Sequence, residues 1–165
     1  MTDMLDDPIL VGVGDAIALT RSEPALARAK LAELWSMVGE HGDALHRCAI
    51  AHAMADVCES VDDELVWDLR ALDAGVTLDD ARLEAAGMAA SVEGLLSSLH
   101  LNLADVYRRL GNAAKAREHV AASTSAIASL AGDGYSQMVR QALSRITFSL
   151  AHEHGPRCGH DHENE

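Results

Sequence analysis

The stretch that most constrains the fold of this chain runs from Ser98 to Ser123, with the sequence SLHLNLADVYRRLGNAAKAREHVAAS. In its first half, apolar side chains recur every three or four residues, which is the period of an α-helix. These side chains are Leu99, Leu103, Val106, Tyr107 and Leu110. Gly111 suits the left-handed conformation that ends a helix, and the side chain of Asn112 can cap the next helix. Because the connection is so short, we predict two antiparallel helices.

The composition agrees with a close-packed helical protein. Of the 165 residues, 48% are hydrophobic, 29 are alanine and only 3% of the chain is aromatic. Small alanine side chains allow helices to approach closely, whereas strands are enriched in β-branched and aromatic residues. A chain of this length is expected to form one domain. We therefore predict an all-α fold, with a single domain over residues 1–151.

Helix-start patterns divide the rest of the chain. Proline follows a capping residue at Asp7-Pro8 and at Ser22-Glu23-Pro24, and an acidic run at Asp62-Asp63-Glu64 suits the start of another helix. Besides the helix that this acidic run opens, the predicted helices span residues 8–20, 23–41, 43–58, 80–90 and 92–110, followed by one from 113 and a last one from about 134.

The hairpin at Gly111 resembles one unit of the tetratricopeptide repeat (TPR) family. Large, small, aromatic, glycine, alanine and large side chains match that family in spacing and type at Leu103, Ala104, Tyr107, Gly111, Ala116 and Val120. Gly42, Gly75 and Gly111 lie 33 and 36 residues apart, close to the family's period of about 34. The resemblance is strongest over residues 98–123.

Over residues 25–130 as a whole the resemblance is weaker, since Trp35, Arg47 and Asp68 depart from the family's pattern. The resemblance implies stacked antiparallel helical hairpins, an α-solenoid of about three units, closed by a C-terminal capping helix. The resemblance also implies that the helical hairpins turn at Gly42, Gly75 and Gly111. Members of this family bind peptides or protein surfaces on a concave face and share no chemistry.

One polar ridge is the best candidate for a binding surface. Ser98, Asn102, Asp105 and Arg109 lie four, three and four residues apart, so they share one helix face. Arg108 flanks this polar ridge, and Arg70 is a further candidate for the same surface. The resemblance places such positions in the concave groove, where Asn can bind a peptide backbone and Arg a carboxylate. The alternative is a solvated face with an ordinary pair between Asp105 and Arg109, worth ~0.3–0.5 kcal/mol.

The net charge and its distribution along the chain limit the classes of molecule that the protein is expected to bind. The net charge is −13; residues 1–91 carry 6 basic and 18 acidic side chains, whereas residues 92–157 carry 7 and 5. Nucleic acid is disfavoured by repulsion. An acidic peptide, a C-terminal carboxylate or the acidic half of a second copy would suit the basic part better. The function predicted is therefore a non-catalytic protein- or peptide-binding module.

The surroundings of the protein are also predicted. No window is apolar enough for a transmembrane helix, and the acidic start of the chain does not resemble a secretion signal, so neither membrane nor export is expected. Three cysteines suit a reducing compartment, so we predict a cytoplasmic protein. The excess of 11 arginines over 2 lysines, with the many alanines, is typical of a GC-rich, bacterial genome.

Residues 152–165 form a separate His- and Cys-rich tail. Its candidate metal ligands are His152, His154, Cys158, His160 and His162, and such donors suit Zn²⁺, Ni²⁺ or copper. The alternative function is thus a metal-handling accessory protein, and the alternative for the tail is a flexible hydrophilic segment. His46, Cys48 and His52 do not converge on one helix face. No catalytic motif is recognisable, so we expect neither an enzyme nor a cofactor beyond a tail-bound metal.

Overall fold

The computed structural model describes residues 7–128, 130, 132 and 134–152. Within them all regular structure is helical, which confirms the predicted all-α class. The helices are α1 (Pro8–Leu19), α2 (Pro24–Val38), α3 (Ala44–Ala55), α4 (Val61–Gly75), α5 (Asp80–Ala85), α6 (Val92–Arg109), α7 (Ala113–Ala128) and α8 (Gly134–His152). No helix of this described part has the length and hydropathy needed to cross a bilayer.

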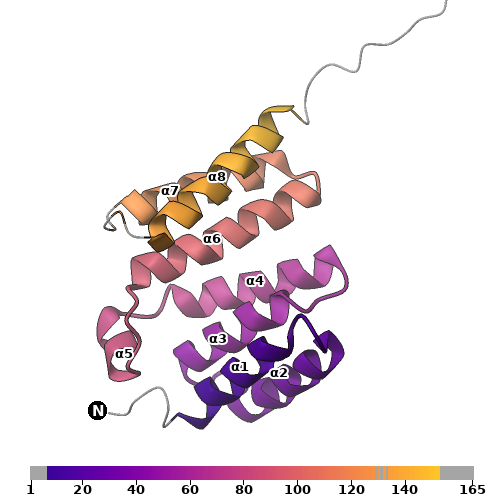
Figure 1. Cartoon of the computed structure of the whole chain (residues 1–165), viewed down its shortest axis with the longest axis vertical. Helices are drawn as coiled ribbons and strands as arrows, with labels where there is room; N and C mark the ends of the chain where they lie inside the picture. Colours follow the sequence, from indigo (N-terminus) through magenta and orange to yellow (C-terminus); the bar gives the residue numbers. More distant parts are fainter. Residues whose placement is uncertain (1–6, 129, 131, 133, 153–165) are drawn as a thin grey trace, which may run out of the picture.

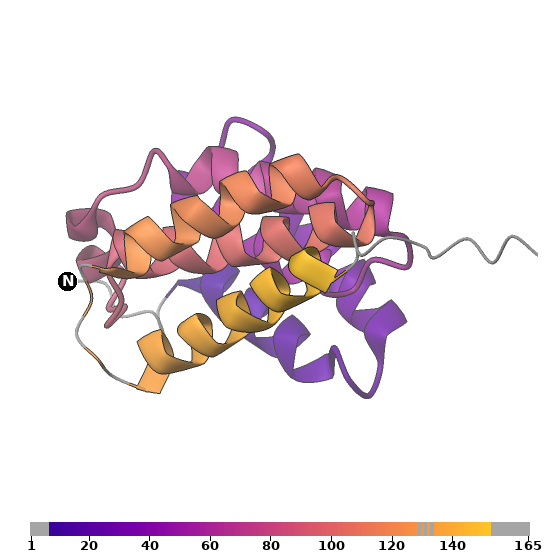
Figure 2. The ribbon, with the colours of Figure 1, turned by 90° about the horizontal axis from the view of Figure 1, so that it is seen from above.

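Along the long axis of the molecule the order from the α1–α3 end is α4, α6 and then α7 with α8, while the short α5 lies back at the level of α3 (Figure 1). Helices α1, α2 and α3 pack together at one end, α4 packs on α3, and α6 packs on α4. At the other end α8 packs against both α6 and α7. Seen from above, α8 runs beside this helix pair and crosses it at an angle (Figure 2).

The predicted hairpin is present as α6 and α7. Gly111 has a φ of 74°, and the backbone N–H of Asn112 donates to the carbonyl of Tyr107 at 2.8 Å. The Asn112 side chain then accepts from the backbone N–H of Lys115 at 3.1 Å. This glycine therefore ends one helix in the left-handed conformation, and the next residue caps the following helix.

The two other glycines predicted as corners have different roles. Gly75 is the last residue of α4 and is buried; a Cβ atom there would lie 2.7 Å from Cδ1 of Leu99 on α6. It thus allows two helices to approach closely. The turn before α3 uses the left-handed Gly39, with a φ of 71°, rather than Gly42. As a result α2 ends at Val38, short of the predicted residue 41.

The predicted helix over residues 80–90 is wrong in length. Helix α5 stops at Ala85 because Gly87 takes a left-handed φ of 69° and the N–H of Met88 donates back to the carbonyl of Leu83 at 3.0 Å. This bonding is that of a glycine C-cap. The stretch after α4 therefore holds only a short helix, where a regular hairpin would need a full-length one.

Alanine and leucine side chains fill the interior. Ala104 on α6 and Ala116 on α7 are both completely buried, as are Leu31 and Ile50 in the first half. Fully burying one such leucine or isoleucine stabilises the fold by about 1.5–3 kcal/mol. Between α6 and α7 two buried serines, Ser97 and Ser123, each place the hydroxyl within hydrogen-bond distance of the other's backbone carbonyl, and the two hydroxyl oxygens lie 3.0 Å apart.

Candidate functional site

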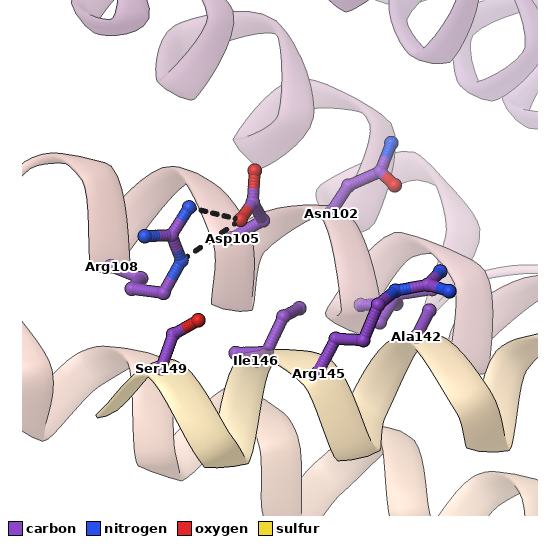
Figure 3. A pocket seen from close by; sticks show the side chains of 8 residues that line it. Asn102, Asp105, Arg108, Ala142, Arg145, Ile146 and Ser149 are labelled. Atoms are coloured by element: carbon purple, nitrogen blue, oxygen red, sulfur yellow. Dashed lines mark hydrogen bonds and ion pairs between the residues drawn. The ribbon is translucent and has the colours of Figure 1, made fainter. Parts of the chain in front are cut away.

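A pocket between α6 and α8 contains three of the predicted binding residues. Asn102, Asp105 and Arg108 line it on the α6 side, beside Leu101, and its volume is about 270 Å³. Figure 3 shows Arg108 paired with Asp105 on α6, and α8 with Arg145 and Ser149 on the other side of the pocket. The complete lining of this α6–α8 pocket is Leu101, Asn102, Asp105, Arg108, Ala142, Arg145, Ile146 and Ser149.

The packing of α8 creates the second wall. Val139, Leu143 and Leu150 are buried along one stripe of α8, and Ile146 packs against Ala104 and Ala116. With that stripe facing α6 and α7, the adjacent face of α8 carries Ala142, Arg145 and Ser149 to the pocket edge. The pocket therefore depends on residues about 40 positions apart in the sequence.

Asp105 is the central acceptor of the α6 wall. Its Oδ1 accepts from Nε and Nη2 of Arg108 at 3.1 and 2.9 Å, and its Oδ2 accepts from Nε of Arg109 at 2.9 Å. One carboxylate thus orients two arginines. These groups are partly exposed, so each pair adds at most about 1 kcal/mol to stability. Their main effect is to hold the side chains in place.

The two arginines face different neighbours. Arg108 lies along the pocket, while Arg109 is turned toward α4 and pairs with Glu64. The hydrogen bond that Arg109 donates to Glu64 raises the pKa of Arg109 further above its ordinary value. The predicted polar ridge is therefore divided, since Arg109 bridges α6 to α4 and does not line the α6–α8 pocket.

Arg145 supplies an available positive charge. Its side chain is exposed on α8, and no ion pair holds it within the described part of the chain. It lies off the buried stripe of its helix, a feature visible in the sequence. The sequence alone does not identify it as a pocket residue, because nothing local indicates which neighbour α8 will face.

Ser98 and Arg70 lie elsewhere. The hydroxyl of Ser98 hydrogen-bonds that of Tyr135 in a separate cavity that His52 also lines. Arg70 is on α4, with its guanidinium 4.4 Å from the ring centre of Trp67. The structure thus places neither residue in the α6–α8 pocket. Trp67 is half-buried and packs edge-to-face on Trp35, with the ring centres 5.0 Å apart, as expected for a core residue.

Behind Asn102 lies a buried acid that sequence analysis did not select. Asp68 on α4 is 1% exposed, and neither carboxylate oxygen has a hydrogen-bond partner among the described residues. Burial, then the charge of Glu64, raises its pKa to about 7, although the nearby Asn102 amide acts to lower it. The sequence did contain one signal for this site, because Asp68 is an acid at a position that departs from the TPR pattern.

The imidazole of His52 completes this polar region. Its Nδ1 lies 3.5 Å from the Asn102 amide nitrogen. Burial lowers the pKa of His52, and the charge of Asp56 opposes that shift. The neutral ring is therefore favoured, so Asn102 donates toward an unprotonated nitrogen. Asn102 thereby joins the α6–α8 pocket to the interior between α3 and α4.

The predicted metal ligands fall almost entirely outside the described residues. His154, Cys158, His160 and His162 all lie there, whereas His152 ends α8. The His152 ring stacks on that of Phe148, with the ring centres 3.9 Å apart. Among residues that the structure describes, no three His, Cys, Asp or Glu side chains are placed to hold a metal ion. Metal binding by the tail stays a prediction.

These features define a class: an all-helical protein with an open polar pocket between two neighbouring helices. No family model matches the chain, and neither a curated protein nor a solved structure is significantly similar to it. The evidence on function is therefore the chemistry of the pocket and the sequence pattern of α6 and α7.

Proposed function

We propose that the protein is a non-catalytic binding module that holds a peptide or protein segment in the α6–α8 pocket. The observation that carries this proposal is that Asn102 and Asp105, two of the four residues selected by their helical spacing, line one pocket in three dimensions together with the flanking Arg108. Spacing on one helix does not require a facing wall, so the pocket supports the proposal independently of the pattern.

The lining suits an extended peptide. Asn102 offers both an amide donor and a carbonyl acceptor, which matches the two hydrogen-bonding groups of a peptide unit. Arg145 can pair with a carboxylate, and Ile146 with Leu101 offers an apolar surface for a side chain. No proton-transfer step is needed for this role.

The size of the pocket favours a segment of a larger partner. Its volume of about 270 Å³ is below the ~300–1,000 Å³ of pockets that enclose a small molecule. A peptide that lies across the groove would place one or two side chains there and contact α6 and α8 on either side. The basic side chains of this region favour an acidic segment or a free C-terminal carboxylate.

A TPR-like arrangement is the proposed architecture of this binding surface. In support, α6 and α7 form a glycine-capped hairpin and α8 packs against both of them. The groove of that family lies between the first helices of adjacent units, and α6 and α8 would hold those positions. The short α5 makes the preceding unit irregular under this proposal.

A pull-down from extract of the native cell tests the function. The double variant Asn102→Ala/Arg145→Glu should keep its helical circular dichroism and lose partners that the wild-type protein recovers. Arg21→Glu is the matched control, because Arg21 is exposed in the turn between α1 and α2. Recovery of the same partners by the double variant would contradict the proposal.

A further inference from the structure

A second pocket lies where the connection between α2 and α3 meets α4. Its volume is about 660 Å³, and its lining shares no residue with the α6–α8 pocket. We call it the Trp–Arg pocket; it is lined by Trp35, Glu40, His41, Arg47, Leu69, Arg70 and Asp73.

Aromatic rings hold the first of its two arginines. The guanidinium carbon of Arg70 lies 4.4 Å from the ring centre of Trp67 and 5.4 Å from that of Trp35. Cation–π contacts of this kind fix the plane of a guanidinium. The carboxylate of Glu40 is 3.8 Å away on a side chain that is 70% exposed, so most of the donor capacity of Arg70 is left for another acceptor.

The second arginine has a buried donor without an acceptor. The side chain of Arg47 is 18% exposed, and its Nη1 donates to the backbone carbonyl of Glu40 at 3.1 Å. Its Nε is buried and has no hydrogen-bond partner in the described structure. Leaving such a donor unsatisfied is costly, and native proteins rarely do so. Because Nε is itself buried, a ligand oxygen would reach it only if the Arg47 side chain turned toward the pocket, and that contact would remove the cost.

The acids of the pocket do not neutralise these arginines at close range. The nearest contacts of Glu40 and Asp73 to the guanidinium groups are 3.8 and 4.0 Å, beyond the ~2.7–2.9 Å of a charge-assisted hydrogen bond. Both acids can swing toward solvent. At ~0.1 M salt the rest of the acidic chain is screened beyond about 10 Å, so the charges that decide ligand binding are those of the lining itself, two arginines and two exposed acids.

We propose that the Trp–Arg pocket binds a carboxylate carried on a flat apolar group. The carboxylate would accept from the fork of Arg70 and, once the Arg47 side chain turns toward the pocket, from Nε of Arg47. The apolar group would lie against Trp35. A planar carboxylate matches a guanidinium fork in geometry. A doubly charged phosphate would meet stronger repulsion from Glu40 and Asp73, so we favour the single charge.

The chain offers a direct probe, because Trp35 and Trp67 are its only tryptophans. The full chain is titrated with benzoate at constant ionic strength while tryptophan fluorescence is recorded, and benzamide serves as the neutral match. Benzoate should give a saturable change at about tenfold lower concentration than benzamide, as the loss of a charge-assisted bond predicts. Equal responses to the two compounds, or no saturable response to benzoate, would overturn the proposal.

Two sources of the carboxylate are distinguished with a second pair of probes. N-acetylphenylalanine imitates the C-terminus of a peptide, and its amide is the uncharged match. Tighter binding of N-acetylphenylalanine than of benzoate would indicate a peptide end, and the reverse a small free acid. In both cases the acid must bind more tightly than its amide, or the proposal fails.

Variants then assign the binding to named residues. Arg47→Met and, as a second variant in case the first does not fold, Arg70→Gln should each abolish the saturable benzoate response. Arg21→Gln is the exposed control and should behave as wild type. Unchanged benzoate binding in a folded Arg47→Met or Arg70→Gln protein would refute the assignment. Arg145→Glu, in the α6–α8 pocket, should leave benzoate binding unchanged, so the two proposals fail independently.

Discussion

The Nδ1 atoms of His100 on α6 and His119 on α7 lie 2.9 Å apart, so one imidazole donates to the other across the hairpin. The ring of His119 also stacks on Tyr107, with centres 5.4 Å apart and planes 11° from parallel. Only one of the two facing nitrogens can carry a proton in this contact. The pair therefore cannot be doubly protonated without separating.

The histidine pair predicts a loss of stability in acid. Burial lowers the pKa of both imidazoles, and for His119 the nearby charges of His100 and Lys115 lower it further. A folded pKa below the unfolded value of about 6.5 means that the unfolded chain binds more protons as the pH falls below about 6.5. The contribution of the neutral histidine pair to the free energy of unfolding is thus complete above about pH 6.5 and is lost as the pH falls below that value.

The measurement is urea unfolding of wild type and His100→Gln at about pH 7.5 and about pH 5. Because glutamine does not titrate, the free energy of unfolding of wild type should fall relative to that of the variant as the pH is lowered. His41→Gln, at an exposed position, should change nothing. A difference between wild type and His100→Gln that does not depend on pH would exclude the pair as its source.

Asp68 predicts the opposite pH dependence. Its pKa of about 7 in the folded protein, against an ordinary value of 3.8, means that the folded state holds the proton more tightly. The resulting penalty is absent below about pH 4, grows as the pH rises toward 7 and is complete above it. Asp68→Asn should therefore stabilise the protein at about pH 8, by up to about 4 kcal/mol before relaxation of the site is considered.

Thermal and urea unfolding of Asp68→Asn at about pH 8 and about pH 4 test this. The gain in unfolding free energy should disappear at the lower pH, where the wild-type carboxyl is already neutral. Asp15→Asn, on an exposed face of α1, is the matched control. If Asp68→Asn were destabilising at pH 8, the carboxylate would have a stabilising partner instead of a desolvation cost.

The sequence could predict those parts of the fold that depend only on neighbouring residues. Spacing and capping residues within α6 and α7 determine that hairpin, so Gly111 and Asn112 were correctly assigned their roles. The pocket depends also on Arg145, whose facing partner is decided by the packing of α8 against two other helices. Gly75 illustrates the same limit, because a glycine required by the approach of Leu99 looks, in sequence, like a glycine required by a turn.

Two helical glycines should respond in opposite directions to alanine. A Cβ at Gly14 of α1 meets no atom within 4 Å, whereas at Gly75 it would lie 2.7 Å from the buried Leu99 side chain. Gly14→Ala should stabilise by about 0.5–1 kcal/mol through helix propensity. Gly75→Ala should destabilise by about 1–3 kcal/mol through overpacking.

Chemical denaturation of both variants provides the test. The denaturant concentrations at the unfolding midpoints are compared, provided that the free energy of unfolding depends equally steeply on denaturant in each protein. Combining Gly75→Ala with Leu99→Val should cost less than the sum of the two single changes, since the smaller side chain makes room for the new methyl group. Strict additivity would mean that α4 and α6 do not meet at these residues.

We predict that the protein takes up metal through the His- and Cys-rich tail and not through its helices. Imidazole and thiolate ligands at His154, Cys158, His160 and His162 should bind Zn²⁺ or Ni²⁺ with sub-micromolar affinity, because four such donors lie within nine residues. Calorimetric titration of the full chain should show this heat, and deletion of residues 153–165 should abolish it while the circular dichroism of the helices is unchanged. The alanine variant of His152 alone should keep most of the uptake, because four ligands remain. Full uptake by the deleted chain would move the metal site to the helical body and refute the assignment to the tail.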